Sequence, residues 1–173
     1  MKKTLFSTMI LISTITFSAS ANAQEYAFNK SLVTVVNPYA EKESKIVDET
    51  EVNINAVRDF SRKFKNGANV KWVKNENGSS VYFVMDGVKM RSSYNTKGKR
   101  EYILKYYDEV RLPENVRHLV RSTYYDYRIA LITEVERNDE VSYLIKMEND
   151  KEFMTVKVDD RELSVFEKTT KVK

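Results

Sequence analysis

The chain contains a single histidine, His118, and no cysteine, so few side chains are available for nucleophilic or metal chemistry. Ser122 and Asp126 lie near His118 in sequence, but neither a glycine-rich turn around the serine nor a second histidine accompanies them. A histidine on the solvent side of a helix is the simpler explanation. Because one imidazole cannot build a two- or three-histidine site and no thiol is present, we expect no metal site.

Paired carboxylates are the other candidate catalytic groups. Glu134 and Glu136 would share one face of a strand, as the two carboxylates of a glycosidase do. Asp159 and Asp160 could bind calcium, but the acidic loop pattern of a calcium site is missing. The basic residues 97–100 could contact phosphate. Solvated strand and turn charges account for all of these groups, so we expect no catalytic residue and no cofactor.

The composition is that of a globular chain: 173 residues, 42% hydrophobic and 31% charged, with 4 glycines and 2 prolines. These values exclude collagen-like and low-complexity disordered chains, and the lack of cysteine excludes a disulfide scaffold. The formal net charge is only +4, without the concentrated basic excess of a nucleic-acid binder. We therefore expect a domain stabilised by packing alone, with no nucleic-acid partner.

The first residues are typical of a secretory signal peptide. Lys2 and Lys3 precede an apolar run over residues 5–17, and residues 21–23 (Ala-Asn-Ala) form a small-x-small cleavage pattern. The run is too short for a membrane-spanning helix, which needs about 20 apolar residues, and no later segment is apolar enough to span. We predict a signal peptide over residues 1–23, cleavage after Ala23, and a soluble periplasmic or secreted protein.

Residues 24–50 are predicted to form an N-terminal arm or linker. Residues 32–36 could make one short strand, but Pro38 and the charged residues 41–45 interrupt the pattern. The remaining residues, 51–173, show regular patterns and are predicted to form the folded domain.

The first half of this domain, about residues 53–107, predicts one helix followed by strands. Val57, Phe60 and Phe64 recur at i, i+3 and i+7 on one helix face, and Gly67 follows as a stop. An alternating pattern then predicts antiparallel strands separated by turns such as Asp86-Gly87. These strands lie around residues 70–72, 81–85, 88–94 and 102–106.

The second half, about residues 112–168, repeats this order. Leu112-Pro113 opens a helix, because proline is tolerated at a helix start. Its buried stripe would contain Val116, Leu119, Val120 and Thr123. Strands are predicted around residues 129–135, 141–147, 154–158 and 163–165.

The two halves match at a spacing of roughly 60 residues, as an internal repeat would. Val57 matches Val116, Val70 matches Ile129, and Trp72 matches Leu131. One helix per half cannot cover both faces of a sheet, so both helices should pack on one face. The predicted fold class is α+β, with two tandem helix-plus-antiparallel-meander repeats in a two-layer arrangement.

These motifs, in this order, resemble a known protein family. In the first half they are the helix of residues 57–64, Asn69-Val70-Lys71-Trp72, Asp86-Gly87 and Tyr94-Asn95-Thr96-Lys97-Gly98. In the second half they are Leu112-Pro113, Val116, Tyr124, Tyr127, Ile129 and Glu134-Val135. Over about residues 53–168 the chain resembles the PepSY-like, beta-lactamase-inhibitor-like (BLIP-like) proteins exported by Bacteroidota. It departs from them at residues 159–162 (Asp-Asp-Arg-Glu), where members often have an Asp-x-Asp-Gly-like turn.

The resemblance implies tandem helix-plus-sheet repeats, a periplasmic or secreted location and no cofactor. Relatives by fold include inhibitors that bind an enzyme through an aromatic-rich sheet face, and propeptide domains that restrain peptidases. The resemblance therefore suggests a binding role.

The alternation also predicts which residues remain on the open side of the sheet. We expect the helices to cover Val70, Trp72, Phe83, Met90, Leu104, Ile129, Tyr143 and Val156. The other side would then be rich in aromatic and cationic side chains, which are common interface anchors. Lysine stems could also shield such a face without any partner. The candidate partner-binding residues are Tyr82, Arg91, Ile103, Tyr107, Arg128 and Phe153.

The sequence therefore predicts an exported, non-enzymatic binding module that engages an acidic envelope or secreted protein or peptide through its open sheet face. One alternative is an inhibitor or propeptide-like regulator of an envelope hydrolase. A second alternative is a carrier of a small apolar ligand, with a pocket between the helix and sheet layers.

Overall fold

The structure is a computed structural model that describes residues 45–172. The predicted signal peptide and residues 24–44 of the predicted arm lie outside the described residues. All described residues belong to one compact unit, residues 42–173. Within this part of the chain, no helix is both long and apolar enough to cross a membrane.

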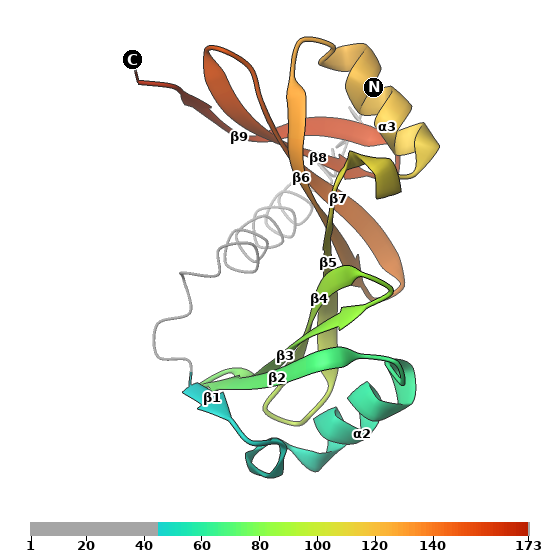
Figure 1. Cartoon of the computed structure of the whole chain (residues 1–173), viewed down its shortest axis with the longest axis vertical. Helices are drawn as coiled ribbons and strands as arrows, with labels where there is room; N and C mark the ends of the chain where they lie inside the picture. The colour runs from blue at the N-terminus through green and yellow to red at the C-terminus, as the bar shows by residue number, and fades with distance from the viewer. Residues whose placement is uncertain (1–44, 173) are drawn as a thin grey trace, which may run out of the picture. The chain divides into compact units, whose positions relative to one another are not determined.

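Most of the described chain forms one antiparallel sheet of nine strands, each paired with its neighbours in sequence (Figure 1). The strands are β1 (Lys45–Val47), β2 (Ala68–Asn75), β3 (Gly78–Met85), β4 (Val88–Asn95), β5 (Arg100–Tyr107), β6 (Arg128–Arg137), β7 (Glu140–Glu148), β8 (Glu152–Asp159) and β9 (Glu162–Thr170). The helices are α2 (Ile54–Lys63) and α3 (Glu114–Thr123), preceded by the 3₁₀ turns η1 (Glu49–Glu51) and η2 (Glu109–Arg111). The fold is thus mostly sheet, with two short helices.

Helix α2 follows from a cap and an apolar stripe. The side chain of Asn53 accepts a hydrogen bond from the Asn55 N–H at 2.9 Å, which satisfies one free donor at the helix start. Val57 and Phe60 are buried as predicted, together with Ala56. The helix ends at Phe64, whose N–H donates to the Phe60 carbonyl.

Helix α3 begins after Pro113, which provides no side-chain cap. Val116 and Val120 are buried, as the pattern predicts. Thr123, predicted in the buried stripe, is instead exposed, and its hydroxyl donates to the Leu119 carbonyl at 3.0 Å. A hydroxyl that can bond to the preceding helical turn has little to gain from an apolar core.

Two separate hydrophobic clusters hold the helices to the sheet. The first contains Val52, Ala56, Val57, Phe60, Phe64, Trp72, Val81, Phe83, Met90, Tyr94 and Ile103. The second contains Leu112, Val116, Val120, Tyr127, Ile132, Ile145, Met147, Met154, Val156 and Val158. Trp72 pairs through Val81 and Ser92 to Ile103, while Tyr107 pairs through Ile132 and Ile145 to Val156.

Both helices cover the same side of the sheet. Paired residues on adjacent strands point to the same side. Ile103 and Tyr107, four residues apart on β5, also point to one side, and each packs with a different cluster. This side is called the helix face below, and the opposite side the second face.

Two residues expected against the helices, Leu104 and Val70, do not lie there, and neither does Leu131, which the internal match aligned with Trp72. Leu104 pairs with Arg91 and Val135 on the second face, because both sides of β5 are apolar and the alternation does not define its orientation. Bulges displace the other two. The register shifts between Ala68 and Lys71 leave Val70 42% exposed, and the shift between Ile129 and Leu131 leaves Leu131 37% exposed while Ile132 enters the core.

Candidate functional site

The second face carries rows of cationic, aromatic and apolar side chains. One cross-strand row runs from Lys71 through Tyr82 and Arg91 to Leu104. The next row runs from Val84 through Lys89 and Tyr106 to Thr133, Leu144 and Lys157. Neither helix packs on these residues, which belong to neither hydrophobic cluster. The second face is therefore the sheet surface on which the sequence predicts a partner.

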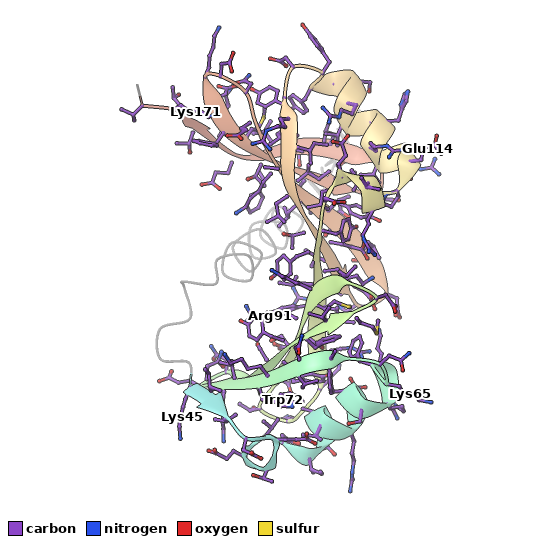
Figure 2. The ribbon with its side chains drawn as sticks, viewed as in Figure 1. Lys45, Lys65, Trp72, Arg91, Glu114 and Lys171 are labelled. Atoms are coloured by element: carbon purple, nitrogen blue, oxygen red, sulfur yellow. The ribbon has the colours of Figure 1, made fainter. Side chains whose placement is uncertain are left out.

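Arg91 lies at the middle of the first row, on β4 (Figure 2). Its Nη2 donates to Ser80 Oγ at 3.1 Å, and its guanidinium carbon lies 5.3 Å from the centre of the Tyr82 ring. Arg91 is only 3% exposed. A guanidinium held in this way orders the Tyr82 ring by stacking. Arg91 therefore positions Tyr82 on this face and is itself buried.

The middle of the second face is less open than the alternation predicts. Ser80, Thr133 and Leu144 are each 2% exposed or less. Lys157, whose side chain is 11% exposed, binds Asp159 at 2.7 Å and lies along the face, as long cationic stems do. Exposed side chains remain around this buried middle: Lys71, Lys89, Arg128, Lys146 and Phe153.

Arg128 and Phe153 form a second group on this face. Arg128 is the first residue of β6, and Phe153 is the second residue of β8. Arg128 and Lys171 both bind the carboxylate of Glu148, Lys171 at 3.0 Å. Lys171 Nζ also lies 4.6 Å from the centre of the Phe153 ring, which is part of a 51% exposed side chain. The hydrogen bonds from Lys171 and Arg128 lower the pKa of Glu148, although desolvation opposes them. The negative charge of Glu148 is thus already neutralised by Arg128 and Lys171.

Two predicted binding residues lie on the helix face instead. Ile103 is 1% exposed inside the first cluster, so its placement on the open side is wrong. Tyr107 packs against the second cluster, and its hydroxyl donates to Glu134 Oε2 at 2.5 Å. Burial, and then the Glu134 carboxylate, raise the pKa of Tyr107 above its usual value. Both errors come from the orientation of β5.

An ion network between the two clusters was not predicted. Lys105 Nζ lies 2.6 Å from Glu134 Oε1 and 3.6 Å from Glu136 Oε2, and Lys63 Nζ lies 2.7 Å from Glu136 Oε1. Burial alone would raise the pKa of Glu136, but the two lysines outweigh it and lower that pKa. A general acid needs a raised pKa. The geometry of Glu134 and Glu136 therefore favours a structural role.

The remaining candidate groups bind other side chains or backbone atoms and do not come together in one site. Ser122 Oγ donates to the Leu119 carbonyl at 3.0 Å, and Asp126 contacts Asn149. Arg100, in the basic turn, binds Asp59 at 2.9 Å. Among residues 45–172, no group of three or more acidic, histidine or cysteine side chains is placed to hold a metal ion.

No protein-family model matches the chain, and no curated protein matches its sequence. Solved structures do share its fold. A BLIP-like protein from Bacteroides fragilis has a TM-score of 0.59 at 10% identity, covering 69% of this chain and 86% of its own. A DUF2874 family protein from Bacteroides ovatus has a TM-score of 0.58 at 17% identity, covering 67% and 85%. A protein from Bacteroides eggerthii described as periplasmic has a TM-score of 0.58 at 11% identity, covering 69% and 88%. At these identities the likeness establishes the fold alone.

Proposed function

We propose that the protein is an exported, non-enzymatic binding module whose second face engages an acidic protein or peptide. The observation that carries this proposal is the cross-strand row of Lys71, Tyr82 and Arg91, with exposed Lys89 beside it. Tyr82 is held by the buried guanidinium, so an aromatic anchor is ordered before any partner arrives. The neighbouring lysines would attract a partner of opposite charge.

Export is part of this proposal. The signal-peptide pattern of residues 1–23 supports it, and so does the shared fold with a Bacteroides protein described as periplasmic. A chain without cysteine is also compatible with an oxidising compartment, because no thiol can pair wrongly there.

We further propose that the two helix-containing halves are tandem repeats. The pairs Lys45–Lys74, Ile46–Val73 and Val47–Trp72 recur sixty positions later as Lys105–Glu134, Tyr106–Thr133 and Tyr107–Ile132. Asp48 caps η1 and Asp108 caps η2 in the same way. The short β1, which precedes α2, thus corresponds to residues 105–107 of β5, which precede α3.

Charge reversal on exposed lysines tests the binding surface. Lys71→Glu with Lys89→Glu should weaken binding of short labelled peptides rich in Asp and Glu by roughly tenfold or more, measured by fluorescence anisotropy. Lys65→Glu with Lys97→Glu changes the net charge equally at exposed positions after α2 and in the β4–β5 turn, and should leave binding nearly unchanged. Equal losses in both variants would show non-specific attraction, and no binding by the natural chain would contradict the proposal.

A regulator of an envelope hydrolase is the second candidate function, and the shared fold with a BLIP-like protein favours it. An inhibitor would lower the activity of its target in proportion to the amount of protein added. Titration of the protein against a panel of beta-lactamases and envelope peptidases tests this. Unchanged rates across the panel at micromolar protein would argue against inhibition.

A further inference from the structure

The sheet has two edges, and the strands at these edges differ in length. β1 at one edge has only three residues, Lys45–Val47, whereas β9 at the other has nine, Glu162–Thr170 (Figure 1). β9 pairs with β8 along its whole length, and no other described strand pairs with it. Within residues 45–172, the backbone N–H and C=O groups on the outer side of β9 thus face no further strand. An open edge of this length can accept an extended peptide as one more strand.

β9 is attached to the rest of the sheet at both ends. Leu163 packs against the second hydrophobic cluster. Lys168 Nζ lies 2.8 Å from Glu152 Oε1, and the Lys171 N–H donates to the Lys151 carbonyl at 2.8 Å. An edge strand that is ordered beforehand loses little conformational entropy when a peptide pairs with it.

The helix-face side of β9 is apolar near the start of the strand. Leu163 pairs with Val158, and Val165 pairs with Val156. Both partners on β8 belong to the second cluster, so Leu163 and Val165 lie on the helix face. Val165 is nevertheless 52% exposed, because no further strand lies beside it. An apolar side chain on an added strand would cover it.

The second-face side of β9 is acidic. Thr155 and Asp159 lie two residues before and after Lys157 on β8, so all three point to the second face. Glu162 pairs with Asp159, and Glu167 pairs with Thr155. Both glutamates therefore lie on the second-face side of β9. Both are exposed, and neither forms an ion pair within the described residues.

A hollow beside the start of β9 adds to this negative charge. It measures about 590 Å³, and its lining consists of Glu140, Val141, Asp159, Asp160 and Glu162. Lys157 neutralises one of these acids, since its Nζ lies 2.7 Å from Asp159 Oδ2. Arg161, in the same turn, lines a different hollow beside α3. The start of β9 therefore attracts a cationic side chain.

We propose that β9 binds an extended segment of a partner protein in which basic and apolar residues alternate. The segment pairs with the outer side of β9, with its basic side chains beside Glu162 and Glu167 and its apolar side chains beside Leu163 and Val165. The charges of β9 and the bulge at Phe166 disfavour strands of another pattern. This site lies at the edge of the sheet, whereas the proposed acidic partner binds the second face, so the two proposals can fail separately.

Two labelled hexapeptides test the charge assignment on the mature protein. Both are acetylated and amidated; one alternates Lys with Val, and the other has Gln in place of each Lys. The protein has a positive formal net charge, so it does not attract a basic peptide as a whole. In fluorescence anisotropy, the lysine peptide should bind at least fivefold more tightly than the glutamine peptide. Equal binding of the two would overturn the charge assignment.

Backbone methylation separates strand pairing from charge attraction alone. In a strand that pairs on one side, only alternate N–H groups face the neighbouring strand. One version of the lysine peptide carries N-methyl groups on its three lysines, and another carries them on its three valines. One version should bind like the unmethylated peptide, and the other should bind at least tenfold more weakly. Equal affinities of the two versions would overturn the strand pairing.

Matched substitutions locate the site on the protein. Glu162→Gln with Glu167→Gln should weaken binding of the lysine peptide about fivefold. Glu76→Gln with Glu101→Gln removes the same charge at exposed positions in the β2–β3 turn and on β5, and should leave binding nearly unchanged. Equal weakening in both double variants would overturn the site.

Hydrogen-exchange mass spectrometry of the natural protein shows where the peptide pairs. The lysine peptide should slow exchange in β9, because its carbonyl groups would accept hydrogen bonds from the outer N–H groups. A second copy of the chain bound at β9 would protect these groups beforehand, and sedimentation would then show a dimer. Exchange in β9 that the peptide leaves unchanged would overturn the proposal.

Discussion

Glu134 and Glu136 show how the surroundings of a residue decide its chemistry. Their spacing alone allows a catalytic pair, since both lie on the same side of β6. In the structure each carboxylate has a lysine within 2.7 Å, and Lys105 lies on β5 between Ile103 of the first cluster and Tyr107, which packs against the second. Sequence alone could not reveal Lys63 as a partner, because it comes from a helix 73 residues away.

Glu136→Gln should lower the free energy of unfolding by about 1 kcal/mol at neutral pH, because it removes the charge that Lys63 and Lys105 bind. The pKa of Glu136 is lowered below its ordinary value of 4.5 in the folded protein. The stabilisation is therefore present above about pH 4.5 and is lost as the pH falls through the folded pKa. Urea unfolding of both proteins across this range measures the effect.

The difference between the two proteins should shrink as the solution becomes more acidic. Lys63→Met should show the same trend, because it removes a partner of the same carboxylate. A difference that stayed constant from neutral to acidic pH would mean that the glutamine acts through packing.

At the scale of single elements, the helices and turns were predictable and the orientation of some strands was not. The buried Val57 and Phe60 of α2, and Val116 and Val120 of α3, follow from helical spacing. The alternation predicts the wrong face for the residues of β5. Ile103 and Leu104 are both buried, so the pattern of apolar residues does not define which of them points to the helices.

A bulge displaced Val70, which the alternation had placed against the helices. A single inserted residue reverses the side to which later residues point, and Asn69, with φ of 55°, marks such a place in β2. Asparagine tolerates this conformation, but the sequence holds many asparagines in ordinary turns. The pairing partners on β1 and β3 determine which one forms the bulge.

The β4–β5 turn provides a test at this scale. Gly98 has φ of 76°, and an added Cβ would lie 2.9 Å from the Ala56 backbone nitrogen, so Gly98→Ala forces turn and helix apart. Gly87 has φ of 74°, but its Cβ would meet only the flexible Arg111 side chain at 3.4 Å. Gly87→Ala should cost about 1 kcal/mol of stability from the backbone alone, and Gly98→Ala clearly more, about 3 kcal/mol. Equal losses in urea unfolding would mean that the contact with α2 contributes little.

At the scale of the whole described domain, two clusters share one sheet but share no residue. They are joined by five pairs between β5 and β6, from Ile103–Glu136 to Tyr107–Ile132, and by the lysine–glutamate network. Proteins built from stacked units can open one unit at a time when the link between units is weaker than each core. The two halves should therefore lose structure separately when one core is damaged.

Val81 and Val156 allow a matched test, since each is 0% exposed in a different cluster. Val81→Ala or Val156→Ala should each cost about 2 kcal/mol of stability, from lost burial plus a small cavity. In hydrogen-exchange mass spectrometry, Val81→Ala should speed exchange in β2–β4 and change β7–β8 little, while Val156→Ala should do the reverse. If either variant speeds exchange equally in both halves, the β5–β6 link is strong enough to make the domain one cooperative unit. Lys63 and Lys105 would then be the residues to change next, because they bind the carboxylates of β6 across this link.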